Sequence, residues 1–188
     1  MCRPEWQVSA LSSAYFIGCG VTLLWLPRFA DIYGRKKMYT LGMVLQVIFY
    51  TAIMFTRNYY VMLISIFIFG TLISFRNSIG FIYFLELVPK KNRAAAGTAY
   101  CVIDGLVYPF LVIYFWKISK DWFWLLLIAY AFQIMGCACS FLWPESPVWL
   151  IELNRYSETL ESFKKIARFN NRFEQLEQEF PNTESLSE

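Results

Sequence analysis

Five long apolar runs, separated by short charged turns, restrict what this sequence can fold into. A helix needs about 20 mostly apolar residues to cross the roughly 30 Å of hydrocarbon in a bilayer, and a charge at that depth costs several kcal/mol. Only 16% of the residues are charged, against about 25% in ordinary soluble domains. We therefore predict an all-α membrane protein whose five-span domain covers residues 1–143. The expected transmembrane helices lie at about residues 8–27, 38–56, 59–87, 94–116 and 122–143.

The cations are distributed unevenly among the turns, and this distribution predicts an orientation. Residues 27–37 read P-R-F-A-D-I-Y-G-R-K-K, which favours a short turn at a membrane surface. Short loops rich in Lys and Arg stay on the cytoplasmic side. With this turn in the cytoplasm, twelve Lys and Arg residues fall on that side, four fall on the other and Arg76 lies within the third run. We expect the N-terminus outside and the C-terminus in the cytoplasm.

Small residues recur at four-residue intervals in two of the runs. The first run carries them at Ala10, Ala14, Gly18 and Thr22, and the third at Gly70, Ser74 and Ser78. Such a stripe allows another helix to approach closely in a membrane. An incidental run of small residues is an equally good explanation of the spacing.

The chain after the fifth run changes character. Pro144 and Pro147 predict a helix stop and a fixed turn. From Ser157 the spacing of apolar residues predicts a short amphipathic helix, with acids near its start and cations near its end, as the helix dipole favours. We assign residues 144–172 to this cytoplasmic turn and helix. Residues 173–188 are acidic and predict a disordered tail.

The sequence offers no catalytic or metal-binding pattern. It contains no histidine, and its five cysteines match no metal-ligand spacing. No nucleophile, phosphate-loop or metalloprotease motif is present. We therefore expect no enzyme activity, no cofactor and no metal, and the small net charge of +3 gives no indication of a nucleic-acid partner.

Two ionisable residues lie near the middle of predicted spans, Arg76 in the third and Asp104 in the fourth. An ionisable group at that depth is a candidate functional residue by default. One hypothesis is that the two line a path for a substrate or a proton. The alternative is a buried Arg76–Asp104 ion pair that only sets the register of two helices.

Three segments carry a resemblance to a known family. The first, A-D-I-Y-G-R-K-K, resembles the loop between helices two and three of the major facilitator superfamily, whose pattern is G-x-x-x-D-R-x-G-R-R/K. The matching positions are Asp31, Gly34, Arg35 and Lys36. The positions that depart from the pattern are Pro27, in place of the leading glycine, and Ile32, in place of the arginine after the aspartate.

The other two segments follow in the same order as in that family. Glu86 and Arg93 resemble the E-x6-R element after helix four. Residues 144–150, P-E-S-P-V-W-L, resemble the P-E-S-P-R-W-L that closes helix six, with Val148 in place of the arginine. The ordered set is similar to the sugar porters and especially to the organic cation/anion transporters.

The resemblance implies that the five spans are helices two to six of a twelve-helix fold with two six-helix lobes. It also implies a charge network that holds the lobes together on the cytoplasmic side in one access state. The candidate members are Asp31, Gly34, Arg35, Glu86, Arg93 and Glu145. Anchoring of the turns in the cytoplasm explains the neighbouring lysines equally well, but it does not explain the acids, which contribute little to topology.

The function implied is transport of a small organic solute, an organic ion or a sugar, by alternating access. The chain would act as part of a larger two-lobe transporter, either within a longer polypeptide or by assembly with another chain. The alternative is a degenerate half-transporter that serves as a structural subunit of a larger membrane complex. The expected partners are the lipid bilayer, the solute, and a second lobe or partner membrane subunits.

Overall fold

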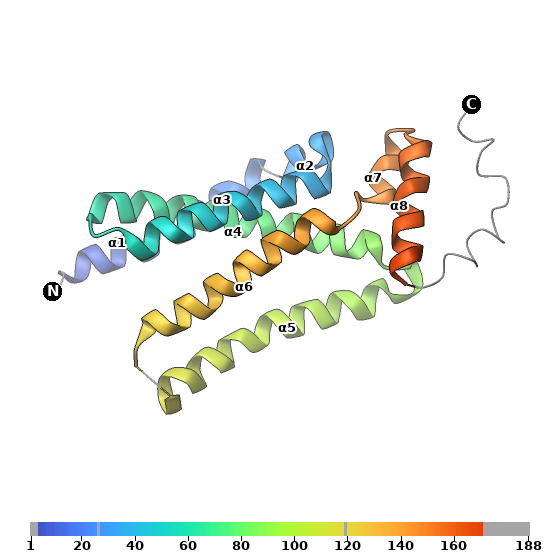
Figure 1. Cartoon of the computed structure of the whole chain (residues 1–188). Helices are drawn as coiled ribbons and strands as arrows, with labels where there is room; N and C mark the ends of the chain where they lie inside the picture. Colours follow the sequence, from blue (N-terminus) through green and yellow to red (C-terminus); the bar gives the residue numbers. More distant parts are fainter. Residues whose placement is uncertain (1–3, 26, 119, 171–188) are drawn as a thin grey trace.

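The fold is a set of long helices with short helices gathered at one end (Figure 1). The computed structural model of the chain describes residues 4–25, 27–118 and 120–170. Within these residues the elements are helical and no strand occurs. The helices are α1 Glu5–Trp25, α2 Pro27–Tyr33, α3 Arg35–Phe55, α4 Tyr59–Leu87, η1 Lys90–Asn92, α5 Arg93–Ile113, η2 Tyr114–Ile118, α6 Trp122–Leu142, α7 Pro147–Glu152 and α8 Tyr156–Phe169.

The predicted all-α membrane fold is confirmed. Four stretches within the described residues are long and apolar enough to cross a bilayer: α3, α4, the continuous stretch Lys90–Ile118, and α6. The first predicted span falls on α1, which has 21 residues but is not among these four. Its first turns carry Glu5 and Gln7, and serines follow at positions 9, 12 and 13. The predicted acidic tail, 173–188, lies outside the described residues.

The helices α1, α3 and α4 lie side by side, with α4 between the other two. A Cβ atom added at Gly70 would collide with the backbone carbonyl of Tyr15, and one added at Gly18 would collide with that of Phe67. The Thr22 hydroxyl donates to the carbonyl of Thr71 at 2.9 Å. Gly18 and Thr22 of the first stripe and Gly70 of the second therefore lie in the α1–α4 interface, where the two helices reach backbone contact.

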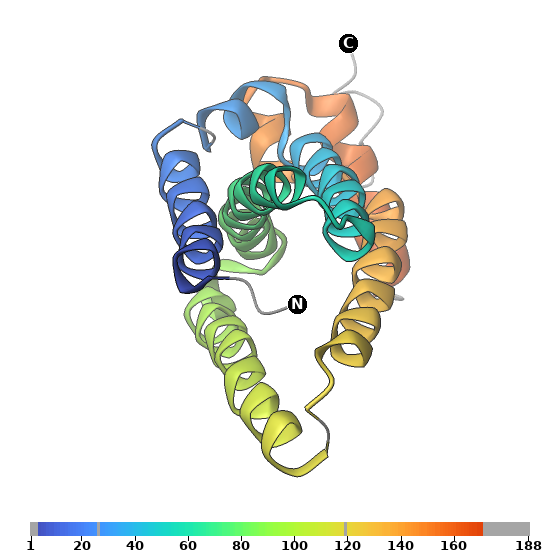
Figure 2. The same ribbon diagram turned by 90° about the vertical axis from the view of Figure 1, so that its left-hand side faces the viewer.

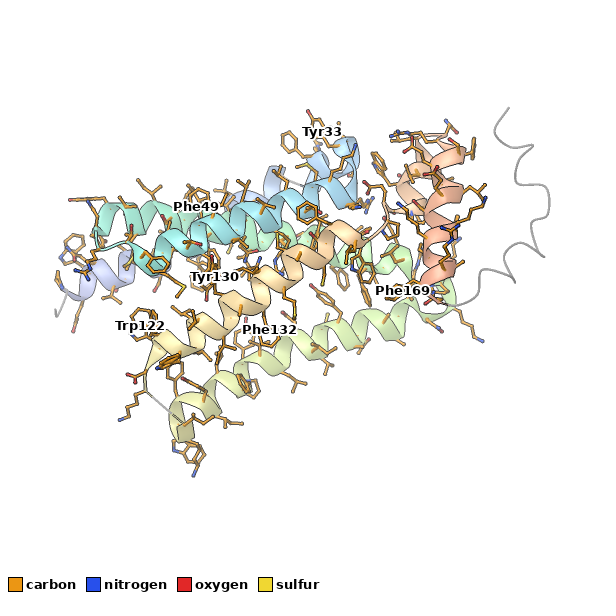
Figure 3. All side chains as sticks on the ribbon, viewed as in Figure 1. Tyr33, Phe49, Trp122, Tyr130, Phe132 and Phe169 are labelled. Carbon is orange, nitrogen blue, oxygen red and sulfur yellow. The ribbon has the colours of Figure 1, made fainter. Side chains whose placement is uncertain are left out.

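The helices α5 and α6 diverge from this layer and converge again where α5 ends and α6 begins (Figure 2). Polar contacts fix α6 against α3: the Tyr50 hydroxyl donates to the carbonyl of Leu126 at 3.0 Å, and Thr51 and Tyr130 share a hydrogen bond of 2.6 Å. By contrast, α5 packs on α4 only near its start, and every residue from Cys101 to Phe110 is exposed. Large side chains of α6 such as Trp122 and Phe132 (Figure 3) are also exposed, at 59% and 65%.

The segment predicted as a turn, 27–37, is mostly helical. The helix α2 occupies Pro27–Tyr33, Gly34 interrupts it with φ 102° and ψ 142°, and α3 starts at Arg35. A proline fits the first position of a helix because the N–H that it lacks would have no partner there. The turn prediction is therefore wrong for all but one residue of this segment, because Gly34 is the one position of 27–37 that lies outside a helix. Beside this break, Ala30 packs with Phe75 and Ile79 in a small buried core.

Candidate functional site

The network predicted from the sequence has Arg35 at its centre. The Arg35 guanidinium lies 2.7 Å from Oε1 of Glu86 through Nη1 and 3.1 Å from Oδ1 of Asp31 through Nη2. The side chains of Arg35 and Glu86 are each 12% exposed, whereas that of Asp31 is 64% exposed. Screening by water leaves an exposed ion pair little net energy. The Arg35–Glu86 pair is therefore stronger than the Arg35–Asp31 pair. Arg35 thus joins the start of α3 to the end of α4 and to α2.

Glu145 acts as the cap of a helix whose own cap residue has no side chain. Gly34 precedes α3 and makes no side-chain cap hydrogen bond. Oε1 of Glu145 instead accepts from the backbone N–H of Lys36 at 2.7 Å, and it also accepts from the N–H of Ser146 at 3.2 Å. A carboxylate at a helix N-terminus satisfies a free donor and complements the helix dipole. One carboxylate therefore serves the beginnings of both α3 and α7.

Two further residues complete the network, and the sequence interpretation missed both. The Ser146 hydroxyl donates to Oε2 of Glu86 at 2.5 Å and accepts from the N–H of Trp149 as the N-cap of α7. The Trp149 indole N–H donates to the carbonyl of Asp31 at 2.7 Å, near the end of α2. A serine directly before a proline is a helix-start signal and could have located α7. Nothing in the sequence pattern points Trp149 toward α2.

The break at Gly34 is closed from both sides by the 145–149 segment. Glu145 caps the beginning of α3, and Trp149 satisfies a carbonyl at the end of α2. A Cβ atom at Gly34 would lie 3.0 Å from Oε2 of Glu145 and 3.2 Å from Cη2 of Trp149. The positive φ of Gly34 also disfavours any residue with a side chain. The matched segments P-E-S-P-V-W-L and D-I-Y-G-R-K are therefore two halves of one contact.

Arg93 plays a different part from the other predicted members. Its Nε donates to the carbonyl of Val88, the C-cap of α4, at 3.2 Å. Within the described residues Arg93 forms no ion pair with Glu86. Its geometry is that of a cap on the last carbonyls of a helix, where a cation is also favoured by the dipole. Of the six predicted residues, the structure brings five together and leaves Arg93 beside them.

The two residues predicted within the membrane are placed differently from each other. Arg76 lines a cavity of about 310 Å³ between α3, α4, α5 and α6. Asp104 is exposed on α5 and does not line this cavity. The ion pairs of the described residues do not include Arg76–Asp104. The geometry thus supports a cavity position for Arg76. It gives no support to an Arg76–Asp104 ion pair that sets the register of two helices.

Within the described residues no group of three or more Cys, Asp or Glu side chains could hold a metal ion. The carboxylates of the network are already used by Arg35, by backbone amides and by Ser146. The arrangement is one of helix caps and ion pairs.

Comparison with known proteins places the chain among membrane transporters. Residues 2–187 match the family described as "Sugar (and other) transporter". The chain is 29% identical over 169 residues to solute carrier family 22 member 15 of Xenopus tropicalis, which covers 89% of this chain and 31% of that protein. It is 27% identical over 174 residues to organic cation/carnitine transporter 2 of Rattus norvegicus, covering 90% of this chain and 30% of that protein.

A third relative is named for another solute. The chain is 30% identical over 144 residues to the beta-alanine transporter of Drosophila melanogaster, which covers 74% of this chain and 23% of that protein. The chain therefore spans less than a third of the length of these curated relatives. Four long apolar helices and this likeness describe an integral, multi-pass membrane protein. The chain belongs to the sugar (and other) transporter family of the major facilitator superfamily.

Proposed function

We propose that the chain forms part of a carrier that moves a small organic solute across a membrane by alternating access. The Arg35 network would be the gate on its cytoplasmic side. The observation that carries the proposal is the bridge from Arg35 to both Glu86 and Asp31, at the point where α2, α3, α4 and α7 meet. The transporters named above are relatives in the same family and support the proposal.

The orientation of the proposed carrier rests on the asymmetry of the cations. The network, α7 and α8 gather at the end of the bundle opposite to the start of α1 (Figure 1). The segments at that end, 27–37, 90–93 and 155–168, carry eleven of the 17 Lys and Arg residues, and segments rich in these residues stay in the cytoplasm. The start of α1 then lies outside. A second lobe or a partner subunit would meet the network from the cytoplasmic side.

The chemistry of the network suits a gate. Asp31 is largely in water, so its contact with Arg35 can be exchanged for another partner at small cost. The Nε of Arg35 is buried and has no hydrogen-bond partner, so the guanidinium has a donor left for a further carboxylate once the packing around it changes. The cap contacts of Glu145 are stronger because a charge meets free backbone donors. An element with exchangeable and fixed contacts can hold two packings of similar energy.

Transport by the protein in proteoliposomes tests the proposal. Labelled carnitine, β-alanine and glucose serve as probes, and substitution of Glu86 by Gln should reduce uptake about tenfold, which corresponds to about 1.4 kcal/mol. Substitution of Glu158 by Gln is the matched control, because Glu158 pairs only with Arg155 on the exposed face of α8. Uptake equal to that of empty liposomes for every probe would overturn the proposal.

The exposed face of α5 favours the alternative hypothesis that the chain is a structural subunit of a larger membrane complex. The apolar side chains of α5 from Cys101 to Phe110 are all exposed, and such a face needs lipid or protein to cover it. If the chain is a structural subunit, it should purify in mild detergent as a complex of fixed stoichiometry and show no uptake. Purification as a lone species would contradict this second hypothesis.

A further inference from the structure

The cavity beside the network has an unbalanced charge. Its volume of about 310 Å³ is at the small end of the range of about 300–1,000 Å³ that small-molecule sites occupy. The charged side chains among its lining residues are Lys36 and Arg76, and no lining residue is acidic. The walls are largely aromatic, with Tyr39, Tyr100 and Trp143 contributed by three different parts of the chain.

Arg76 has donors that the described residues do not satisfy. Its Nη2 donates to Oδ1 of the adjacent Asn77 at 3.1 Å, but its Nε is buried without a hydrogen-bond partner. No carboxylate of the described residues lies within ion-pair distance of it. A buried donor without an acceptor is costly, and a guanidinium carries five donors and no acceptor. The guanidinium therefore lines the cavity without a carboxylate partner among the described residues.

Lys36 adds positive charge to the same cavity. Its ammonium donates to the carbonyl of Phe141 at 3.3 Å, at the end of α6. Within the described residues no carboxylate forms an ion pair with this ammonium. The backbone of Lys36 is held by Glu145. The position of this cation therefore depends on the network.

Gly80 creates part of the space. A Cβ atom there would come within 2.9 Å of the Tyr39 ring, so the glycine lets this ring lie against α4. Tyr100 in turn lies against Phe84 and Phe81, with ring centroids 5.9 and 5.3 Å apart. Aromatic side chains in the lining favour a flat ligand, because rings gain energy from offset and edge-to-face contacts.

We propose that this cavity binds a small, flat organic anion, with its carboxylate on Arg76 and its ring between the aromatic walls. The inference rests on the proposed function and names the class of solute that would pass the gate. Arginine binds a carboxylate through two parallel hydrogen bonds, and Lys36 raises the local potential for the anion. The same two cations disfavour an organic cation, although one relative is named an organic cation transporter.

Equilibrium binding to the protein in phosphatidylcholine nanodiscs tests the inference. The probes are labelled benzoate, benzyl alcohol and benzylamine, which have similar size and carry a negative charge, no charge and a positive charge. Benzoate should bind at least about tenfold more tightly than benzylamine, since one charge-assisted hydrogen bond in a desolvated site changes the dissociation constant by about tenfold. Benzyl alcohol should fall between the two.

Substitutions assign the preference to the cavity. Arg76→Gln should reduce benzoate affinity about tenfold, and Arg76→Lys should keep most of the preference for benzoate over benzylamine because it keeps the charge. The control is Lys117→Gln, which removes a cation that lies over Trp116 away from the cavity, and it should leave binding unchanged. If Arg76→Gln does not fold, Lys36→Gln tests the same point.

The outcomes separate this inference from the proposed function. Equal binding of benzoate and benzylamine, or benzoate binding that neither Arg76→Gln nor Lys36→Gln changes, would overturn the anion site. If the protein takes up cations but does not bind benzoate, the anion site is also wrong, and the carrier proposal stands. Benzoate binding without any uptake would support the site and count against the carrier. If added phosphatidylglycerol occupies the site and benzoate cannot displace it, the ligand is a lipid headgroup and the inference of a small solute is wrong.

Discussion

Substitution of Gly34 by Ala is the sharpest test of how the α2–α3 break is held. Gly34 has φ 102° and ψ 142°, a region that costs a residue with a side chain about 1–3 kcal/mol. The new Cβ atom would also lie 3.0 Å from Oε2 of Glu145. Displacing that carboxylate weakens its hydrogen bonds to Lys36 and Ser146, and hydrogen bonds to charged groups contribute about 1.5–3 kcal/mol. The two effects together predict a loss of about 3–5 kcal/mol.

Thermal unfolding in detergent, followed by tryptophan fluorescence, measures this loss. At about 2–4 °C per kcal/mol for a chain of this size, the Tm should fall by about 10 °C. Gly20→Ala is the matched control, because nothing lies within 4 Å of a Cβ atom added there. Since alanine is favoured over glycine inside a helix by about 0.5–1 kcal/mol, the control should be neutral or slightly stabilising.

A double substitution separates the two causes. In a Glu145→Ala background the carboxylate can no longer be displaced, so Gly34→Ala should cost clearly less than in the wild-type protein. The remaining cost reports the backbone strain together with the close contact between the new Cβ atom and the Trp149 ring. If Gly34→Ala melts at the same temperature as Gly20→Ala, the assignment of Gly34 as the constrained residue of the break is refuted.

Two further predictions concern contacts between helices. Trp149→Phe removes the indole donor to the carbonyl of Asp31 but keeps most of the packing. It should lower the free energy of unfolding by about 1 kcal/mol and the Tm by a few degrees. An unchanged Tm would show that this hydrogen bond does not stabilise the protein. Gly70→Ala places a Cβ atom against the backbone of Tyr15 and should separate α1 from α4. Disulfide trapping of cysteines placed across these two helices should then fail, while Gly105→Ala, which meets nothing within 4 Å, should leave trapping intact.

Much of the fold was readable from the sequence because a bilayer restricts the possible structures so strongly. The predicted third span, 59–87, has the bounds of α4, and Asn58 before it accepts from the N–H of Tyr60 as an N-cap residue should. The charges of the segment 27–37 indicate a position at the membrane surface, but they do not distinguish a turn from the short helix that the structure has there. Charges exclude a helix from hydrocarbon but not from the water beside it, and α2 carries its cation and its acid in an exposed position.

The candidate site was readable only in part. Asp31 and Arg35 are four residues apart, so their contact follows from helix geometry. Glu86 and Glu145 lie far along the chain, and only the resemblance to a family connected them to Arg35. The contact of Trp149 with α2 depends on how α7 docks, and spacing in the sequence carries no information about docking.

Because one oxygen of Glu145 binds two backbone amides, the beginnings of α3 and α7 should open at the same time. Oε1 accepts from the amides of both Lys36 and Ser146, which belong to elements more than 100 residues apart in the chain. Any motion that withdraws this carboxylate frees both amides in the same event. In hydrogen–deuterium exchange the two amides should therefore lose protection at one common rate and respond together when a solute is added. The start of α3 and the start of α7 would then open and close synchronously, although no covalent path of short length connects them.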